Sequence, residues 1–223
     1  MTPILPLFAT AYLPPIAYVA TLMHYETIAI EACETYPKQT YRNRCSILTA
    51  NGLLHLAIPV TRPQGNHTII SEAEISYAEP WNVRHWRAIE SAYSASPYFL
   101  YYRDGIESIL LKKHNRLIDL NTELTTHILK KLKIPTHLKF TPDYVKPTDT
   151  LPYSDFRQSF SPKNPSNPAI FQPYNQVFSH KYPFCPNLTI LDLLFNLGPE
   201  ANQYLKCSVN LSIYDKTNSP NNL

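Results

Sequence analysis

Three cations lie close together near residue 40. Lys38, Arg42 and Arg44 fall within seven positions of the run Pro37–Cys45. If this run forms a β-strand, alternation of side chains puts all three on one face together with Thr40. Neighbouring positive charges repel each other, so such a face needs open water or an anion bound among the cations. The pattern predicts an anion-binding site, with Asn43 on the opposite face; the alternative is a charged edge strand that resists aggregation.

One histidine has surroundings that suit acid–base chemistry. His85 lies between Trp81 and Trp86 and is flanked by Arg84 and Arg87. Apolar rings and positive neighbours lower the pKa of an imidazole, so we expect a neutral ring that can accept a proton from a substrate. The alternative is a hydrogen-bonded histidine of the core.

A further pair of opposite charges lies in a proline-rich stretch. Asp155 and Arg157 are two residues apart, and Lys163 follows them. In an extended chain the first two side chains point to the same side, where they could orient a zwitterion such as an amino acid. A surface ion pair is the alternative.

Polar side chains also occur within apolar runs. Asp192 and Asn196 are four residues apart in a helical pattern that is otherwise apolar, so they share one face. Burying polar groups is unfavourable unless they find partners, so these two either face water or line a pocket. The same question applies to Tyr12, Asn121 and Gln176.

Composition excludes several classes of protein. A net charge of +3 and a pI near 8.6 are too mild for a protein that coats nucleic acid, so no nucleic-acid partner is expected. Four glycines, with no GxGxxG or GxxxxGK[ST] motif, cannot build a glycine-rich phosphate cradle. The four cysteines lack the spacing of a zinc site, and reduced thiols in the cytoplasm are expected. The sequence predicts no metal and names neither a cofactor nor an oligomeric state.

The first 23 residues are apolar, yet they do not predict a membrane segment. They contain Pro3, Pro6, Pro14 and Pro15 and lack the basic region that opens a signal peptide. We expect a buried loop followed by a core helix and no integral membrane segment.

The patterns predict an α+β fold, with α/β as the alternative. A mixed sheet of about four strands is expected in the N-terminal third, packed by several helices. Strands are predicted at 27–32, 41–49, 53–61 and 67–76, with a hairpin turn at Asn51-Gly52. Helices are predicted at 16–23, 81–92 and 98–106, at 188–197 after a cap at Asn187, and in a segment capped by Asp119 or Asn121 and stopped by Pro135.

One domain is expected, because 223 residues fit a single core. It spans 1–207 and includes a proline-rich connection at 141–173. Residues 208–223 form a polar tail.

Taken together, several motifs resemble the bacterial WbqC-like protein family, most specifically its branch in Bacteroidetes. They cover most of the chain up to about residue 205. The matching stretches are 11–16, 38–45, 52–60, Trp81 with 85–89, 96–99, 155–157 with 161–163, 174–178 and 186–196. One departure is that many members carry Gln-Pro before the Tyr-Leu-Pro motif, where this chain has Ala9-Thr10.

The resemblance implies a biological context, the synthesis of cell-surface polysaccharides, more than a particular reaction. Members are associated with gene clusters for O-antigen and other cell-surface polysaccharides, and a glycine-transferring role is implied for some of them. It therefore implies a transferase that attaches glycine or a related acyl group to a sugar, acting on a small-molecule or sugar substrate with phosphate or carboxylate groups.

Two hypotheses follow for the site. In the transferase hypothesis, Lys38, Arg42 and Arg44 bind the anion, His85 is the general base, and Asp155 with Arg157 fixes the donor. In the alternative, the same cationic face belongs to a non-catalytic module that binds an anionic glycan or nucleotide. The remaining candidate contacts to a ligand are Tyr12, Asn43, Lys163, Gln176 and Asp192.

Overall fold

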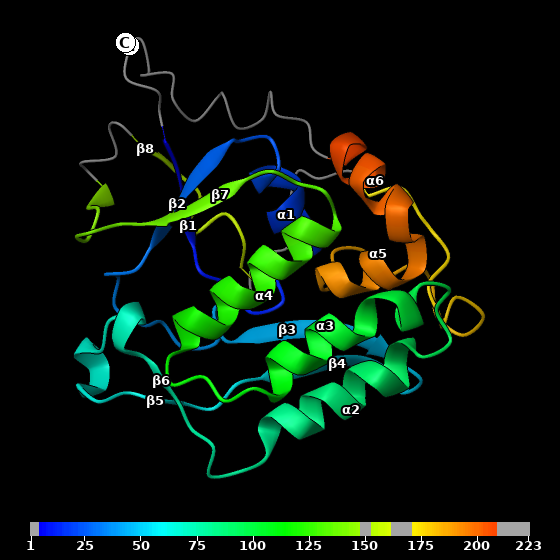
Figure 1. Ribbon diagram of the computed structural model, residues 1–223, viewed down its shortest axis with the longest axis horizontal. Helices are drawn as coiled ribbons and strands as arrows, with labels where there is room; N and C mark the ends of the chain where they lie inside the picture. The colour runs from blue at the N-terminus through cyan, green and yellow to red at the C-terminus, as the bar shows by residue number, and fades with distance from the viewer. Residues whose placement is uncertain (1–4, 148–152, 162–170, 209–223) are drawn as a thin grey trace.

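A computed structural model describes residues 5–147, 153–161 and 171–208 (Figure 1). The first half contains β1 (Leu5–Ala9), α1 (Ile16–Leu22), β2 (Thr27–Glu31), β3 (Arg44–Thr49), β4 (Gly52–Ala57), β5 (Val60–Thr61), the 3-10 turns η1 (Gly65–His67) and η2 (Ile70–Glu72), and β6 (Glu74–Ile75). The second half contains α2 (Trp81–Tyr93), α3 (Phe99–Leu111), α4 (Leu117–Lys131), β7 (His137–Phe140), β8 (Tyr153–Asp155), α5 (Ile190–Leu197), η4 (Gly198–Glu200) and α6 (Ala201–Cys207).

The predicted α+β class is confirmed. A four-stranded sheet has the order β7-β2-β1-β8, and each neighbouring pair in it is parallel. Two antiparallel pairs, β3 with β4 and β5 with β6, form separate small sheets. Figure 1 shows the parallel sheet on one side of α4 and the β3–β4 hairpin with α2 and α3 on the other.

The strand order reverses at β1, which has β2 on one side and β8 on the other. The chain leaves β1, crosses through α1 to β2, continues outward to β7 and then returns to the far side of β1 as β8. In open parallel sheets, ligands bind in the crevice at the carboxyl ends of the strands where the order reverses. A site is therefore expected at this edge.

The five predicted helices are present as α1 to α5, but α6 was not predicted and two predicted caps are wrong. The helix α4 begins at Leu117, before both Asp119 and Asn121. Asn187 does not cap the helix that follows it; Thr189 does, accepting a hydrogen bond from the Leu191 amide. The Asn187 side chain instead accepts a hydrogen bond from the Ala17 amide, so it satisfies a free N–H in the first turn of α1.

The strands of the parallel sheet were harder to predict. Residues 5–9, expected as a buried loop, form the central strand β1, and β7 and β8 lie after residue 136 rather than in the N-terminal third. The hairpin is confirmed, but its two-residue loop is Ala50 and Asn51, one position earlier than the predicted Asn51-Gly52 turn; Gly52, at φ +98°, already pairs with Thr49. The predicted strand 67–76 is interrupted by the 3-10 turns that end at His67 and span Ile70–Glu72, and only Glu74–Ile75 pairs with β5.

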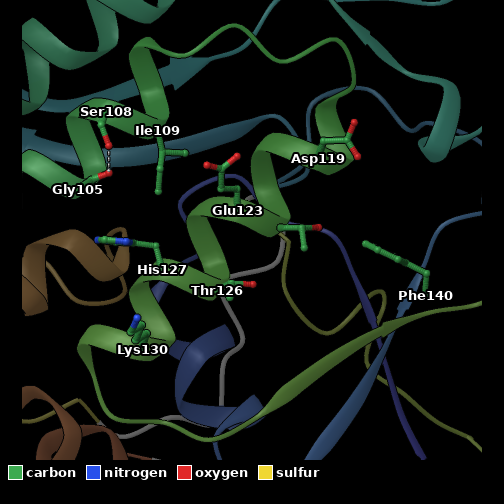
Figure 2. Close-up of a pocket in the computed structure, with 10 residues that line it drawn as sticks. Gly105, Ser108, Ile109, Asp119, Glu123, Thr126, His127, Lys130 and Phe140 are labelled. Carbon is green, nitrogen blue, oxygen red and sulfur yellow. Dashed lines mark hydrogen bonds between the residues drawn. The ribbon is translucent and has the colours of Figure 1, made fainter.

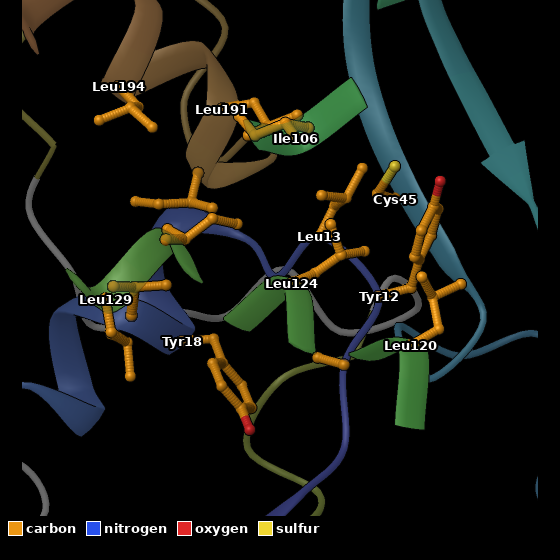
Figure 3. Packing of buried hydrophobic residues seen from close by; sticks show 14 of the residues in the cluster. Tyr12, Leu13, Tyr18, Cys45, Ile106, Leu120, Leu124, Leu129, Leu191 and Leu194 are labelled. Carbon is orange, nitrogen blue, oxygen red and sulfur yellow. The ribbon is translucent and has the colours of Figure 1, made fainter. Parts of the chain in front are cut away.

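One core joins these elements. Side chains from the loop after β1, from β3 and from four helices meet in it, as Figure 3 shows for Tyr12, Leu13, Tyr18, Cys45, Ile106, Leu120, Leu124, Leu129, Leu191 and Leu194. The loop after β1 is thus fixed by packing on both sides. Its residues Thr10 to Leu13 are buried, and Leu13 has a positive φ of 41°, a conformation that only firm packing holds for leucine.

Candidate functional site

Polar side chains gather at the carboxyl edge of the parallel sheet. Thr10 follows β1, Glu31 ends β2, Thr141 follows β7 and Asp155 ends β8. Because parallel strands end at the same edge, the fold brings together residues that are up to about 145 positions apart in the sequence. Thr10, Glu31 and Thr141 are buried, so their polar atoms need partners within the protein.

Glu31 is fully buried and is satisfied by four donors. One carboxylate oxygen accepts hydrogen bonds from the Cys33 amide and the Thr141 hydroxyl, at 3.0 and 2.8 Å. The other accepts from the Val145 amide and from Nη1 of Arg157, both at 3.0 Å. Charge-assisted bonds of this kind are what make a buried carboxylate tolerable.

Arg157 joins this carboxylate to a second one. Its Nη2 donates to Oδ2 of Asp155 at 2.6 Å, its Nε also faces that carboxylate, and its Nη1 donates to the Val145 carbonyl as well. The predicted proximity of Asp155 and Arg157 is therefore present in the structure. The guanidinium is occupied by protein groups, so Arg157 orders the site rather than offering free donors to a ligand.

A second buried ion pair lies beside the first. Arg42 meets Glu34 in a two-bond contact, with Nε–Oε1 and Nη2–Oε2 distances of 2.7 Å. Burial raises the pKa of the Glu34 carboxyl, and the contact with Arg42 opposes that rise. Arg42 and Arg157 both line one small cavity of about 10 Å³, together with Thr10, Tyr41 and Phe160 at the ends of β1 and β8.

A cleft of about 460 Å³ opens next to these pairs. It is lined by Cys33, Glu34, Thr35, Pro37, Tyr144 and Gln158. The ring of Tyr144 lies over the Arg157 guanidinium at 5.5 Å, so the cleft and the buried network share a wall. Its volume falls within the range of small-molecule sites, about 300 to 1,000 Å³.

The ion-pair network, which includes the 26% exposed side chain of Asp155, carries an excess of one negative charge. Three carboxylates, from Glu31, Glu34 and Asp155, face two guanidiniums, from Arg42 and Arg157. The thiol of Cys33 responds to this field: its pKa is raised by burial first and then by the carboxylates of Glu31 and Asp143. The cleft therefore favours a positive group over an anion.

The predicted cationic face does not form. Arg44 is the first residue of β3, and the chain before it turns at Gln39, whose φ is +61°. Arg42 is consequently buried against Glu34, Lys38 is exposed, and Arg44 is half-buried with its Nε unpartnered among the described residues. The strand prediction over 41–43 is wrong because this segment is a turn that packs under the sheet edge; Lys163 lies outside the described residues.

His85 is part of a buried aromatic cluster. Its Nδ1 is 2.9 Å from the Tyr12 hydroxyl, and its ring meets Trp81 edge-on at a centroid distance of 5.1 Å. Burial lowers the pKa of His85 to about 4, and a hydrogen bond with the Ala57 backbone partly opposes this. The ring is therefore neutral at physiological pH, with both nitrogens engaged by protein groups.

Asp192 and Gln176 form a third polar group, within α5 and the segment before it. The Gln176 amide donates to Oδ2 of Asp192 and to the Cys185 carbonyl, both at 2.9 Å, and the Tyr174 hydroxyl also donates to Asp192. Burial raises the pKa of Asp192, while these donors oppose the rise. These contacts join the chain before α5 to the helix itself.

Asn43 and Asn121 both support the loops of the site. Asn43 donates to the Ile58 carbonyl at 2.9 Å, and Asn121 donates to Thr10 and to the Arg42 carbonyl at 3.1 and 2.8 Å. Asn121 thereby connects α4 to the loop after β1 and to the turn that carries Arg42.

Sequence reasoning missed Glu31, Glu34 and Thr141. One signal was present: Glu31 interrupts the apolar run Thr27–Ala32, a position where a carboxylate is unfavourable without partners. Glu34 and Thr141 offered no such signal, because each becomes interior only when distant segments fold over it.

A second, shallower hollow lies between α3 and α4 (Figure 2). It has a volume of about 590 Å³, and Asp119, Glu123, Thr126 and His127 face it from α4. The Glu123 carboxylate already binds Lys112 and His114, at 2.7 and 2.8 Å. The Glu123 carboxylate is therefore already paired with protein groups. The hollow is less suited to bind a ligand than the cleft.

Two further properties of the described residues concern metal binding and membrane insertion. In the described part of the chain, no three His, Cys, Asp or Glu side chains are placed to share a metal ion. No helix there has the length and apolar character needed to cross a bilayer. All four cysteines are free thiols.

The chain belongs to the WbqC-like protein family, whose model matches residues 10–155. This match covers β2, β7 and β8 of the sheet, most of the cleft lining and the Tyr12–His85 cluster, whereas β1, Arg157 and Gln158 lie outside it. The chain is also similar to an uncharacterized protein, Rv1507c, of Mycobacterium tuberculosis, with 29% identity over 221 residues that cover 87% of this chain and 94% of the relative. No solved structure matches the chain.

Proposed function

We propose that the cleft binds the ammonium group of a small molecule and that the protein transfers an aminoacyl group, such as glycyl, onto a sugar of a cell-surface polysaccharide. The observation that carries the proposal is the excess of one carboxylate over the guanidiniums in the ion-pair network beside the cleft. An amino acid or an amino sugar supplies a positive group of the right size. The resemblance to WbqC-like proteins supports the kind of reaction, and the charge supports the kind of ligand.

Glu34 is the residue best suited to move a proton in this cleft. It lines the cleft, and burial raises the pKa of its carboxyl above the ordinary value, which makes the carboxylate a better proton acceptor. The bound ammonium first gives one proton to Glu34 and becomes a free amine. This amine attacks the activated acyl group, so that a C–N bond forms, the acyl bond to its leaving group breaks, and the second proton departs with the leaving group.

The other predicted residues take supporting parts in this proposal. Asp155 holds Arg157, which in turn holds Glu31, so the three keep the floor of the cleft in place. The role of His85 as general base stays a prediction, because His85 does not line the cleft and its ring is engaged by Tyr12. A direct comparison of Glu34 and His85 variants separates the two assignments.

The test measures thermal unfolding and calorimetric binding with glycine, glucosamine, N-acetylglucosamine and acetate. The two ammonium compounds should raise the unfolding midpoint by about 5 °C at saturating concentration, whereas acetate and the acetylated sugar should not. Glu34→Gln should abolish the shift. Glu107→Gln is the matched control, since it removes a carboxylate of α3 that pairs with Arg103 outside the cleft.

Equal stabilisation by acetate and glycine contradicts the ligand class. Formation of an acylated amino sugar, followed by mass spectrometry with activated glycyl donors, tests the reaction itself. Ammonium binding without any product favours the second hypothesis, a non-catalytic binding module. That alternative is supported by the neutral, fully hydrogen-bonded state of His85.

A further inference from the structure

A second pocket lies where α4 ends, away from the cleft. It has a volume of about 560 Å³ and is lined by Tyr98, Tyr101, Tyr102, Lys130, Lys131, Leu132, Lys133, Gly198, Pro199 and Asn202. The strand β7 starts four residues after Lys133 and runs toward the carboxyl edge of the sheet. The pocket is therefore at the opposite end of β7 from the cleft, and a ligand can bind there whether or not the cleft has the proposed transferase activity.

Three lysines give this pocket a concentrated positive charge. Lys130, Lys131 and Lys133 are exposed, and among the described residues the lysine that forms a salt bridge is Lys112, not one of these three. The carbonyl end of α4 contributes only about half a negative charge, and the residues that line the pocket include no carboxylate, although Glu200 follows the lining residue Pro199. Three ammonium groups outweigh both, so the pocket favours an anion.

The backbone fixes the third lysine in place at an energetic cost. The Ile134 amide donates to the Leu129 carbonyl and the Lys133 amide to the Lys130 carbonyl, the paired bonds of a Schellman turn. Lys133 occupies the left-handed position of this turn, with φ +56°, where glycine is the favoured residue. A lysine here is less stable than glycine, yet it adds a cation to the pocket.

Three tyrosines supply a partly exposed aromatic wall. Tyr101 is 74% exposed, and its ring meets Tyr102 edge-on at a centroid distance of 4.7 Å. The ring of Tyr98 packs against Gly198, where a Cβ atom would lie 2.6 Å from it. The tyrosine wall is thus held from behind by Tyr102 and Gly198, and the Tyr101 ring is left open for stacking.

We infer that this pocket binds a nucleoside diphosphate, with the phosphates on the lysines and the base on the Tyr101 ring. Lysine ammonium groups hold phosphates as point charges, and stacking of a base on an aromatic ring tolerates any base. The pocket volume lies in the range of small-molecule sites. A pyrophosphate or a nucleoside alone occupies only one half of this arrangement.

Calorimetry with UDP, ADP, pyrophosphate and uridine tests the inference on the whole protein. UDP and ADP should bind at least tenfold more tightly than pyrophosphate or uridine, and more weakly as salt is added. Tyr101→Ala should weaken UDP about tenfold and leave pyrophosphate unchanged. Leu100→Ala is the matched control, because Leu100 precedes Tyr101 on α3, is 77% exposed and does not line the pocket.

The variant Lys133→Gly should change thermal stability and UDP affinity in opposite directions. It should raise the unfolding midpoint by about 2 to 4 °C, since glycine relieves the left-handed strain, and weaken UDP about threefold to fivefold. Lys139→Gln, which removes an exposed cation of β7, should leave UDP binding unchanged. Glu34→Gln should also leave it unchanged, which separates this site from the cleft.

Three outcomes overturn the inference. They are equal affinity for UDP and pyrophosphate, unchanged UDP affinity in Lys133→Gly, and an equal loss in Lys139→Gln, which would indicate unspecific attraction to positive charge.

Discussion

Arg42 and Glu34 hold each other through two parallel hydrogen bonds of 2.7 Å at the floor of the cleft. Both side chains are almost fully buried, at 3% and 9% exposed. An ion pair in this setting stabilises the fold mainly by keeping either charge from being buried alone. It also fixes the carboxylate that we assign to proton transfer.

Removing one member of this pair should be far more harmful than removing both. Arg42→Met leaves the Glu34 charge buried without its partner and should lower the free energy of unfolding by about 3 to 5 kcal/mol. The double variant Glu34→Leu/Arg42→Met should lose much less. Urea denaturation of the two single variants and the double variant measures the coupling.

An exposed ion pair provides the control for this double-mutant cycle of Glu34 and Arg42. Arg84 contacts Glu79 at 2.6 Å, but both side chains are about two-thirds exposed. Arg84→Met should change the unfolding free energy by at most about 1 kcal/mol. Additive losses in the Glu34 and Arg42 cycle would show that the pair is not coupled.

The buried imidazole should make stability depend on pH. The pKa of His85 is about 4 in the folded protein against 6.5 ordinarily, so between these values the unfolded chain takes up a proton that the folded chain refuses. The stabilisation is complete above pH 6.5 and is lost as the pH falls toward 4. The loss should approach about 3 kcal/mol.

The variant His85→Gln tests this directly. Its unfolding free energy, measured by urea denaturation from pH 7 to pH 4, should fall less steeply than that of the native protein. Identical slopes contradict the assignment. The same variant tests the predicted general base, since unchanged turnover would rule that role out.

The hydroxyl of Tyr12 should matter for stability as the partner of His85. Tyr12→Phe leaves Nδ1 of His85 buried without its hydrogen bond and should cost about 1 to 3 kcal/mol of unfolding free energy. Tyr182→Phe, which removes a hydroxyl that donates to the Ala50 carbonyl near the surface, should cost less. Urea denaturation compares them, and equal losses would mean that burial does not strengthen the dependence on Tyr12.

Local patterns predicted the helices well because apolar periodicity is a property of one segment. Trp81–Tyr93 and Ile16–Leu22 carry their buried faces in the sequence itself. The strand β1 was missed because Leu5–Ala9 has a proline at its second position and no alternation, and its partners β2 and β8 become visible only in the folded sheet.

The site was predicted only where its residues are neighbours in the sequence. Asp155 and Arg157 are neighbours in the sequence, so their contact followed from alternation alone. The sign of the charge at the cleft did not follow, because it depends on Glu31 and Glu34 meeting two arginines from distant segments. Counting the cations of residues 38–44 alone predicted an anion site, whereas the folded network carries the opposite excess.

The conformation of Gly198 leads to a last prediction. This residue ends α5 at φ +52° and ψ −121°, and an added Cβ would lie 2.6 Å from the ring of Tyr98. Gly198→Ala therefore combines backbone strain with a steric clash and should lower the free energy of unfolding by about 2 to 4 kcal/mol. Gly65→Ala is the matched control, because Gly65 has φ +58° with open space around its Cβ position and should cost only about 1 to 2 kcal/mol. Urea denaturation distinguishes the two, and equal losses would show that the Tyr98 ring moves aside freely and that the tyrosine wall of the second pocket is not held from behind.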